Sequence, residues 1–136
     1  GVAVVLDEFD RLNDRTEIIY DLQMLNEDAD HALGIIMISN QHPTRISLDP
    51  RSQSRLDCQT LQFKPYTTDQ LSEILEQRVQ RAFNRPESVP EPVIETIAEQ
   101  AAEQNGDCRK ALQKLLKVAR KADREGKSNL EVQDIP

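Results

Sequence analysis

The sequence is poor in aromatic residues, in cysteines and in long hydrophobic runs. It holds no Trp, two Tyr and three Phe in 136 residues, which predicts an aliphatic core. Two cysteines, Cys58 and Cys108, are too few and too far apart for a metal knuckle or a disulfide framework. We expect both to be small, at least half-buried residues in a reducing compartment.

No hydrophobic run approaches the length of a membrane span, and no segment has the basic and apolar composition of a signal peptide. We therefore expect no membrane partner and a cytoplasmic protein, or a nuclear one if its source is eukaryotic. The chain begins with Gly1 and enters an apolar run at once. This start leads us to expect a piece of a longer protein.

Positive charge is outnumbered by negative charge. The chain has 17 Lys and Arg residues against 24 Asp and Glu, a net charge of -7. Because phosphate binding depends on clustered Lys and Arg, this balance argues against the chain being a nucleic-acid-binding protein by itself. The 38% hydrophobic content supports a core, and the length suits one domain with a small second lobe.

Two apolar runs without alternation predict strands buried on both faces, at residues 2–6 and 33–38. A helix is expected between them over residues 13–30, where Asp14 and Glu17 have the spacing of a capping box. Strand, helix and strand in this order form a βαβ unit. The two strands should therefore be parallel neighbours.

The middle of the chain is less regular. Pro43 and Pro50 interrupt it, and a short helical turn is expected over residues 49–56. The alternating segment "TLQFK", residues 60–64, predicts a third strand near a sheet edge.

After Tyr66 the sequence has the periodicity of helices only. Thr67 and Gln70 form a capping box before the first helix, and Pro92 suits the first turn of the second. Asp107 can cap the third helix, and Gly126 can end it. These patterns predict an α/β portion over residues 1–66 and a helical bundle over residues 67–136.

Polar residues follow both predicted strands. Asp7 and Glu8 end the first one, and Asn40 follows the second. Open parallel sheets bind their ligands at the carboxyl ends of strands. Adjacent carboxylates there could hold Mg²⁺ and polarise an attacking water, and the Asn40 amide could orient that water. The alternative is a strand that simply meets solvent, with Asn40 as a turn residue.

Three arginines are candidate phosphate ligands. Arg51 and Arg55 lie one helical turn apart, which could project a guanidinium at phosphate oxygens or could mark an ordinary solvated face. Arg109 lies in the first turn of a predicted helix, against the helix dipole. Phosphate binding by Arg109 would explain this unfavourable position. The alternative is an ordinary surface arginine.

The order and spacing of these segments resemble the AAA+ ATPases of the origin-recognition and cell-division-control initiator family. "VVLDEFDRL" resembles the Walker B strand of that family, and "IIMISN" resembles its sensor 1 strand. "LDPRSQSRL" with "LQFKPYTTDQLSEIL" is similar to its arginine-finger segment and lid entry. "NGDCRKAL" is similar to its sensor 2 helix. The resemblance runs from Val2 to about Gly126.

The resemblance implies an α/β fold, the C-terminal part of an AAA+ parallel-sheet core followed by an all-α lid. The implied ligands are ATP or ADP with Mg²⁺, and the implied partners are neighbouring AAA+ subunits and origin DNA. In this family Asp7 would hold magnesium through water, Glu8 would activate water, and Asn40 would be sensor 1.

The arginines take roles by the same resemblance. Arg55 would be the finger offered to a neighbouring subunit's nucleotide, with Arg51 the weaker candidate. Arg109 would be the sensor 2 arginine, which contacts nucleotide from the lid. The implied function is a part of an ATP-hydrolysing replication initiator that recognises origins and loads a helicase.

The sequence departs from the family pattern in one important respect. No G-x-x-x-x-G-K-[ST] stretch is present, and that loop supplies the phosphate cradle. We expect the phosphate loop upstream and a winged-helix DNA-binding domain downstream, so that this chain alone is inactive in ATP hydrolysis. Three alternatives stay open: a clamp-loader subunit, a DEAD-box-type helicase, and a non-enzymatic interaction module. The DEAD-box alternative lacks its Ser-Ala-Thr motif here.

Overall fold

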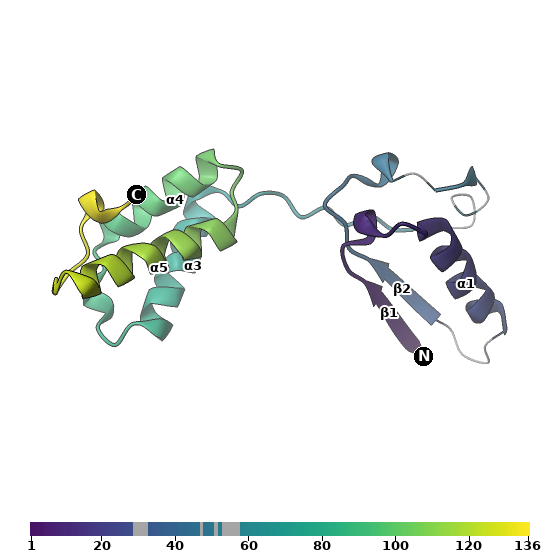
Figure 1. Ribbon diagram of the computed structural model, residues 1–136, viewed down its shortest axis with the longest axis horizontal. Coiled ribbons are helices and arrows are strands. Elements are labelled where there is room, and N and C mark those ends of the chain that lie inside the picture. Colours follow the sequence, from purple (N-terminus) through teal and green to yellow (C-terminus); the bar gives the residue numbers. More distant parts are fainter. Residues whose placement is uncertain (29–32, 47, 51, 53–57) are drawn as a thin grey trace. The chain divides into compact units, whose positions relative to one another are not determined.

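The computed structural model describes residues 1–28, 33–46, 48–50, 52 and 58–136. It divides into two compact units, Gly1–Gln62 and Phe63–Pro136, which Figure 1 draws together. We call them the α/β unit and the lid unit and describe each by itself. The division falls slightly before the one that the sequence suggested after residue 66.

The α/β unit is built on a two-stranded parallel sheet. Strand β1 (Val2–Leu6) pairs with β2 (Leu33–Met37), and helix α1 (Arg15–Asp28) connects them. The register sets Val4 beside Ile35 and Leu6 beside Met37. The predicted βαβ unit with parallel strands is therefore confirmed. The expectation of strands buried on both faces is wrong, because alternate residues of each strand are half-buried and the residues between them are exposed.

The start of α1 is defined by Asp14, whose carbonyl oxygen accepts a hydrogen bond from the Ile18 N–H (3.0 Å). Within the helix, Ile19 is fully buried, whereas Leu25 is exposed. The helical spacing of Ile18, Leu22 and Leu25 in the sequence predicts a buried Leu25, and this prediction is wrong. Leu25 lies near the C-terminal end of α1.

The predicted third strand over residues 60–64 is wrong. Residues 58–67 form no strand, and Leu61 and Phe63 are 78% and 87% exposed. A strand needs the backbone groups of a neighbour, and in the described part of the chain β1 and β2 pair only with each other. Most of the helical turn expected over residues 49–56 lies outside the described residues. At its start Asp49 accepts hydrogen bonds from the backbone and hydroxyl of Ser52 (3.0 and 2.7 Å).

Cys58 is exposed and Cys108 is half-buried. The expectation of a half-buried Cys58 is wrong. Cys58 lies in the extended segment of residues 58–67, where Leu61 and Phe63 are also exposed. Within the residues that the structure describes, no helix has the length and apolar character needed to cross a membrane.

The lid unit contains three helices, α3 (Thr68–Ala82), α4 (Glu91–Glu103) and α5 (Cys108–Arg124). Each begins as the sequence predicts. Thr67 and Gln70 form a capping box on α3, Pro92 lies in the first turn of α4, and Asp107 accepts hydrogen bonds from the Arg109 and Lys110 N–H groups (2.9 and 3.3 Å). Caps of this kind satisfy backbone donors that helix starts leave free.

A continuous aliphatic core holds the three lid helices together. The fully buried side chains include Leu71 of α3, Ile97 of α4 and Val118 of α5. The segment after α5 closes the bundle, because Leu130 is buried and its N–H donates to the carbonyl of Ser88 (2.8 Å). A short 3-10 turn, Val132–Asp134, follows and packs against α4 and α5.

Gly106 connects the start of the lid unit to the turn before α5. Its φ of 59° lies in the left-handed region, and its carbonyl accepts a hydrogen bond from the Tyr66 N–H (3.2 Å). A Cβ at this position would lie 2.3 Å from the carbonyl oxygen of Tyr66. Only glycine fits here, for both its conformation and the close approach.

Candidate functional site

The carboxyl ends of β1 and β2 are joined by backbone hydrogen bonds beyond the last paired residues. The Ile38 N–H donates to the Leu6 carbonyl (2.9 Å), and the Phe9 N–H donates to the Ile38 carbonyl (2.9 Å). Asp7 and Glu8 lie between these two bonds along the chain, and Asn40 lies two residues after Ile38. The structure therefore brings Asp7, Glu8 and Asn40 to the same edge of the sheet.

Glu8 has a left-handed backbone conformation, with φ of 51° and ψ of 39°. Such values are uncommon for residues other than Gly, Asn and Asp, and they cluster at functional sites. Phe9, the residue after Glu8, is buried and so anchors the turn. The Glu8 side chain is exposed and forms an ion pair with Arg11 (2.9 Å). Exposed pairs of this kind are weak, so the Glu8 carboxylate can be released to act on a ligand.

The Asp7 carboxylate is exposed, and its Oδ1 accepts a hydrogen bond from the Glu8 N–H (2.8 Å). This bond fixes the direction of the side chain at the end of β1. Among the described residues, no three His, Cys, Asp or Glu side chains form a cluster that could hold a metal ion. Magnesium at phosphates commonly takes one or two carboxylates, phosphate oxygens and waters. A single oriented carboxylate such as Asp7 fits that kind of binding.

Asp10 is a residue that the sequence did not single out. Its Oδ1 accepts a hydrogen bond from the Asn40 N–H (3.1 Å), which ties the turn after β1 to the loop after β2. That hydrogen bond, assisted by one from Ser39, lowers the pKa of Asp10. The signal for Asp10 was present in the sequence, since an acidic residue just after two candidate acids can serve as a support for them.

The arginines are distributed over both units. Arg109 lies in the first turn of α5 in the lid unit and is exposed, with its backbone N–H capped by Asp107. Arg51 and Arg55, the two candidates for the arginine finger, lie outside the described residues. Their predicted roles stay predictions from the sequence.

Comparison with known proteins identifies the family. Residues 72–136 match the family described as the Cdc6 AAA+ ATPase-type lid domain, which corresponds to nearly all of the lid unit. An ORC1-type DNA replication protein of Pyrococcus abyssi is 39% identical over 132 residues, 95% of this chain. The chain belongs to the ORC1/Cdc6 family of AAA+ proteins.

Further relatives carry the same name. An ORC1-type DNA replication protein of Methanocorpusculum labreanum is 38% identical over 97% of this chain. The chain spans about a third of the length of these ORC1-type relatives, 31% of the Pyrococcus abyssi protein and 32% of the Methanocorpusculum labreanum protein. The matches favour the replication-initiator interpretation over the clamp-loader, helicase and non-enzymatic alternatives.

Solved structures support the fold. The Aeropyrum pernix Orc1 protein, whose structure is a complex with DNA, superposes with a TM-score of 0.83 at 30% identity, over 98% of this chain and 35% of that one. Cdc6p from Pyrobaculum aerophilum superposes with a TM-score of 0.79 at 24% identity, over 97% of this chain and 37% of that one. The prediction of an AAA+ core segment followed by an all-α lid is therefore confirmed. ORC1/Cdc6 proteins belong to a class that generally binds nucleotide with Mg²⁺.

Proposed function

We propose that this ORC1/Cdc6 chain carries the hydrolytic and sensing residues of an ATP-dependent replication initiator. In this proposal Asp7 holds Mg²⁺ through water and Glu8 polarises the water that attacks the γ-phosphate. Asn40 orients that water. ATP hydrolysis would then act as the switch of an initiator that assembles with neighbouring AAA+ subunits on origin DNA.

One observation carries the proposal. The hydrogen bonds between the ends of β1 and β2 support a ligand site formed by an acidic pair and an amide, because parallel sheets bind ligands at this edge. Glu8 has a left-handed backbone conformation, and its N–H donates a hydrogen bond to the Asp7 carboxylate. The next residue, Phe9, is buried. The conformation of Glu8 supports the proposal, because backbone conformations of this kind cluster at functional sites.

The arginines complete the proposal. Arg109 would contact the nucleotide phosphates from the lid unit, which gives a reason for a cation in the first turn of α5 despite the helix dipole. Arg55, or less favourably Arg51, would act on the nucleotide of a neighbouring subunit. In the full-length protein, Arg55→Ala should preserve ATP binding by the monomer and depress hydrolysis in the assembly.

The decisive experiment is Glu8→Gln in the full-length protein. Gln has a similar shape but cannot accept a proton, so we expect ATP and Mg²⁺ binding to survive while single-turnover hydrolysis falls by roughly 10² to 10⁴. Bound nucleotide after gel filtration and released phosphate are measured on the same sample. The matched control is Glu17→Gln, an exposed glutamate at the start of α1, which should leave both unchanged. Hydrolysis at the unmodified rate in Glu8→Gln contradicts the proposal.

Asp10 provides a second test of the same geometry. Asp10→Ala removes the acceptor of the Asn40 N–H and should reduce hydrolysis by about tenfold, because the reacting groups lose their alignment. Asp10→Asn keeps an oxygen acceptor and should restore most of the rate. A merely structural role would instead lower stability and nucleotide binding together.

A further inference from the structure

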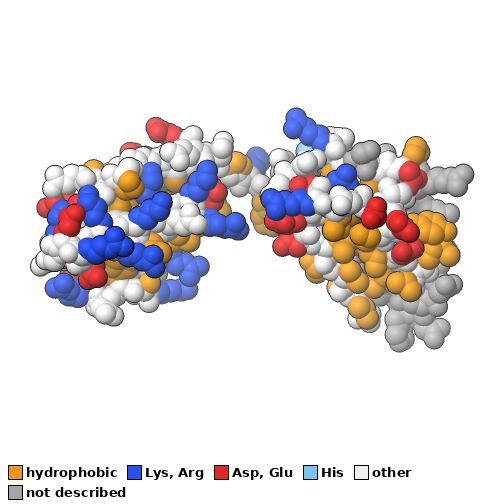
Figure 2. Space-filling model, in the orientation of Figure 1, with side chains coloured by type: hydrophobic (Ala, Val, Ile, Leu, Met, Phe, Trp, Pro, Cys, Tyr) orange, Lys and Arg blue, Asp and Glu red, His pale blue; other side chains and the backbone are white. Residues whose placement is uncertain are grey.

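The exposed side of α5 is strongly basic in a chain of net charge -7. Its 17 residues carry seven Lys and Arg side chains and one acid, Asp123. Figure 2 shows Lys and Arg side chains gathered on the surface of the lid unit. The buried side chains of α5 are Ala111, Leu115, Val118 and Ala122, and the cations occupy the remaining part of its circumference.

Two of the seven cations are used within the lid. The Lys114 Nζ donates to Gln100 Oε1 of α4 (2.6 Å), and the Lys121 Nζ lies 3.5 Å from Asp134. The other five form no ion pair with any residue that the structure describes, and all five are exposed. We call these five the α5 basic face: Arg109, Lys110, Lys117, Arg120 and Arg124.

Several charges of the α5 basic face lie in unfavourable positions. Lys117, Arg120 and Arg124 follow one another at spacings of three and four residues, where like charges repel. Arg109 and Lys110 lie at the positive end of the helix dipole. A polyanion bound along the face would relieve the repulsion between these charges.

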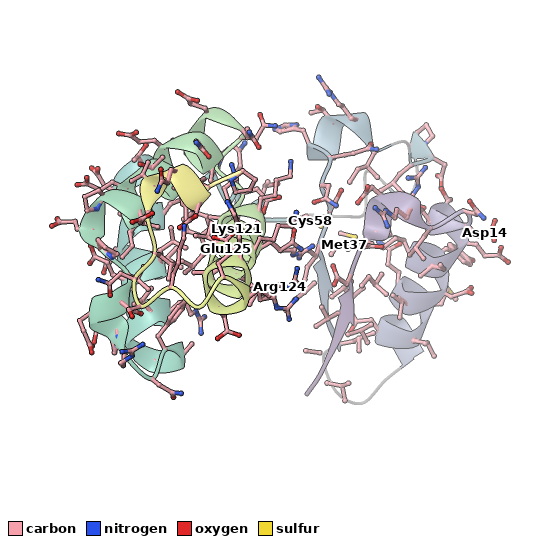
Figure 3. The ribbon with its side chains drawn as sticks, turned by 60° about the vertical axis from the view of Figure 1, so that its left-hand side comes forward. Asp14, Met37, Cys58, Lys121, Arg124 and Glu125 are labelled. Carbon is pink, nitrogen blue, oxygen red and sulfur yellow. The ribbon has the colours of Figure 1, made fainter. Side chains whose placement is uncertain are left out.

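The geometry of the face suits a regular row of phosphates. Lys110, Lys117 and Arg124 are seven residues apart, which places them along one side of the helix at intervals of about 10 Å. Arg124 lies at the C-terminal end of α5 beside Lys121 and Glu125 (Figure 3). The whole helix is about 25 Å long, comparable to several phosphates of one strand of a duplex.

The composition of the face distinguishes between anionic partners. Its exposed hydrophobic neighbour is Leu116 (48%), whereas protein interfaces are centred on aromatic and apolar residues and are depleted in Lys. The helix has no aromatic residue on which unpaired bases could stack. Its apolar side is buried in the lid core and unavailable to a membrane.

We propose that the α5 basic face of the lid binds the phosphate backbone of a nucleic-acid duplex without reading its sequence. This inference does not depend on the proposed nucleotide chemistry, because it uses residues of the lid alone. It assigns the lid a direct contact with duplex, in addition to its predicted role in sensing nucleotide through Arg109. The net negative charge of the chain does not reveal this basic face, because acidic residues predominate on other elements. Helix α4, for example, has four glutamates and no basic residue.

The test is duplex binding by the 136-residue chain, measured by fluorescence anisotropy with a short labelled DNA of mixed sequence over a series of salt concentrations. The variant is Lys117→Gln with Arg120→Gln and Arg124→Gln. The matched control is Lys64→Gln with Arg78→Gln and Arg81→Gln, which removes the same charge from exposed positions outside α5. Thermal unfolding followed by circular dichroism verifies that each protein is folded.

The unmodified chain should bind weakly, with a dissociation constant on the order of 10⁻⁴ to 10⁻⁶ M at physiological salt. The α5 variant should bind at least about tenfold less tightly and should lower the slope of log K against log salt by about 3, one for each lost contact. The control variant should change both quantities far less. A second titration with an RNA duplex of the same length shows whether the face prefers DNA or RNA. Binding of either duplex supports the proposal.

Four outcomes overturn the proposal, the last being the absence of duplex binding by the unmodified chain. The first is an equal loss of binding in the control variant, which would indicate a general effect of net charge. The second is tighter binding of a single strand than of the duplex. The third is displacement of the duplex by polyglutamate at an equal concentration of charge, which would indicate that the face suits an acidic protein. Absence of duplex binding by the folded, unmodified chain at low salt also contradicts it.

Discussion

The α/β unit and the lid unit differ in how much of their hydrophobic surface they bury. In the described part of the chain, the α/β unit has two buried hydrophobic side chains, Phe9 and Ile19, whereas the core of the lid unit contains fourteen. Hydrophobic side chains of the α/β unit lie on its surface (Figure 2), among them Val5 and Ile36, which are 55% and 53% exposed.

The two units are therefore stabilised by different interactions. The lid is stabilised by a closed core, with caps at its helix starts and a C-terminal segment packed against it. The α/β unit is held mainly by backbone hydrogen bonds between β1 and β2 and by polar contacts such as Asp10 with Asn40. The residues of the candidate site lie in the unit with less core.

The comparison is tested most directly by separating the units. Residues 63–136 should fold alone with a cooperative thermal transition, because their core is complete within that range. Residues 1–62 should show no such transition, because a two-stranded sheet with one helix buries too little apolar surface. Circular dichroism and hydrogen exchange measure both. A cooperative transition in residues 1–62 would contradict our account of the α/β unit.

A matched pair of substitutions compares the two units in the intact chain. Ile97 is fully buried in the lid, whereas Ile36 is half-exposed on the sheet. Ile97→Ala should cost about 2 to 5 kcal/mol of unfolding free energy, because it leaves a cavity in a closed core. Ile36→Ala should cost less than about 1 kcal/mol. Urea unfolding measures both, and similar costs would show that the sheet face is packed in solution.

Substituting two glycines with similar backbone conformations tests how closely the Tyr66 backbone approaches Gly106. Gly106 and Gly126 both have positive φ, 59° and 67°, but a Cβ at Gly126 would meet no atom within 4 Å. Gly126→Ala should cost about 1 kcal/mol, the price of a left-handed alanine. Gly106→Ala should cost at least about 2 kcal/mol, because it adds a clash with the Tyr66 backbone. Equal costs in urea unfolding would mean that the Tyr66 segment moves away freely.

The smallest expected effect concerns the C-terminal segment of the lid and depends on pH. Asp134 is buried, and its Oδ1 accepts a hydrogen bond from Lys127 Nζ (2.6 Å). This hydrogen bond, with a second from the Glu131 N–H, lowers the pKa of Asp134. Because the folded pKa is lower than the unfolded value of about 3.9, the stabilisation is present above that pH and is lost as pH falls through the folded pKa.

Asp134→Asn should therefore lower the melting temperature near neutral pH and weaken its decline below about pH 4. Asp123→Asn, an exposed carboxylate of α5, is the control and should follow the unmodified protein. Circular dichroism melts over a pH series give the comparison. An unchanged pH profile in Asp134→Asn would show that Lys127 and Asp134 do not interact in solution.

Local sequence determined most of the lid. The capping box at Thr67 and Gln70, the Asp107 cap and the stop at Gly126 depend on residues within a few positions of each other, so the pattern sufficed to predict them. The same holds for the parallel pairing of β1 and β2, since a strand, a helix and a strand leave one favourable arrangement. The adjacency of Asp7 and Glu8 to Asn40 followed from that pairing.

The tertiary structure decided what depends on contacts between distant residues. Residues 60–64 alternate like a strand, but a strand forms only where a neighbouring backbone offers hydrogen bonds, and alternation alone does not reveal a neighbour. The Asp10 contact with Asn40 spans thirty positions, and Gly106 is required by the backbone of Tyr66, forty residues earlier. The sequence by itself determined which local elements form and which chemistry they carry. Only the tertiary structure decided which elements find partners, because hydrogen bonds and close packing require atoms that the chain brings together from far apart.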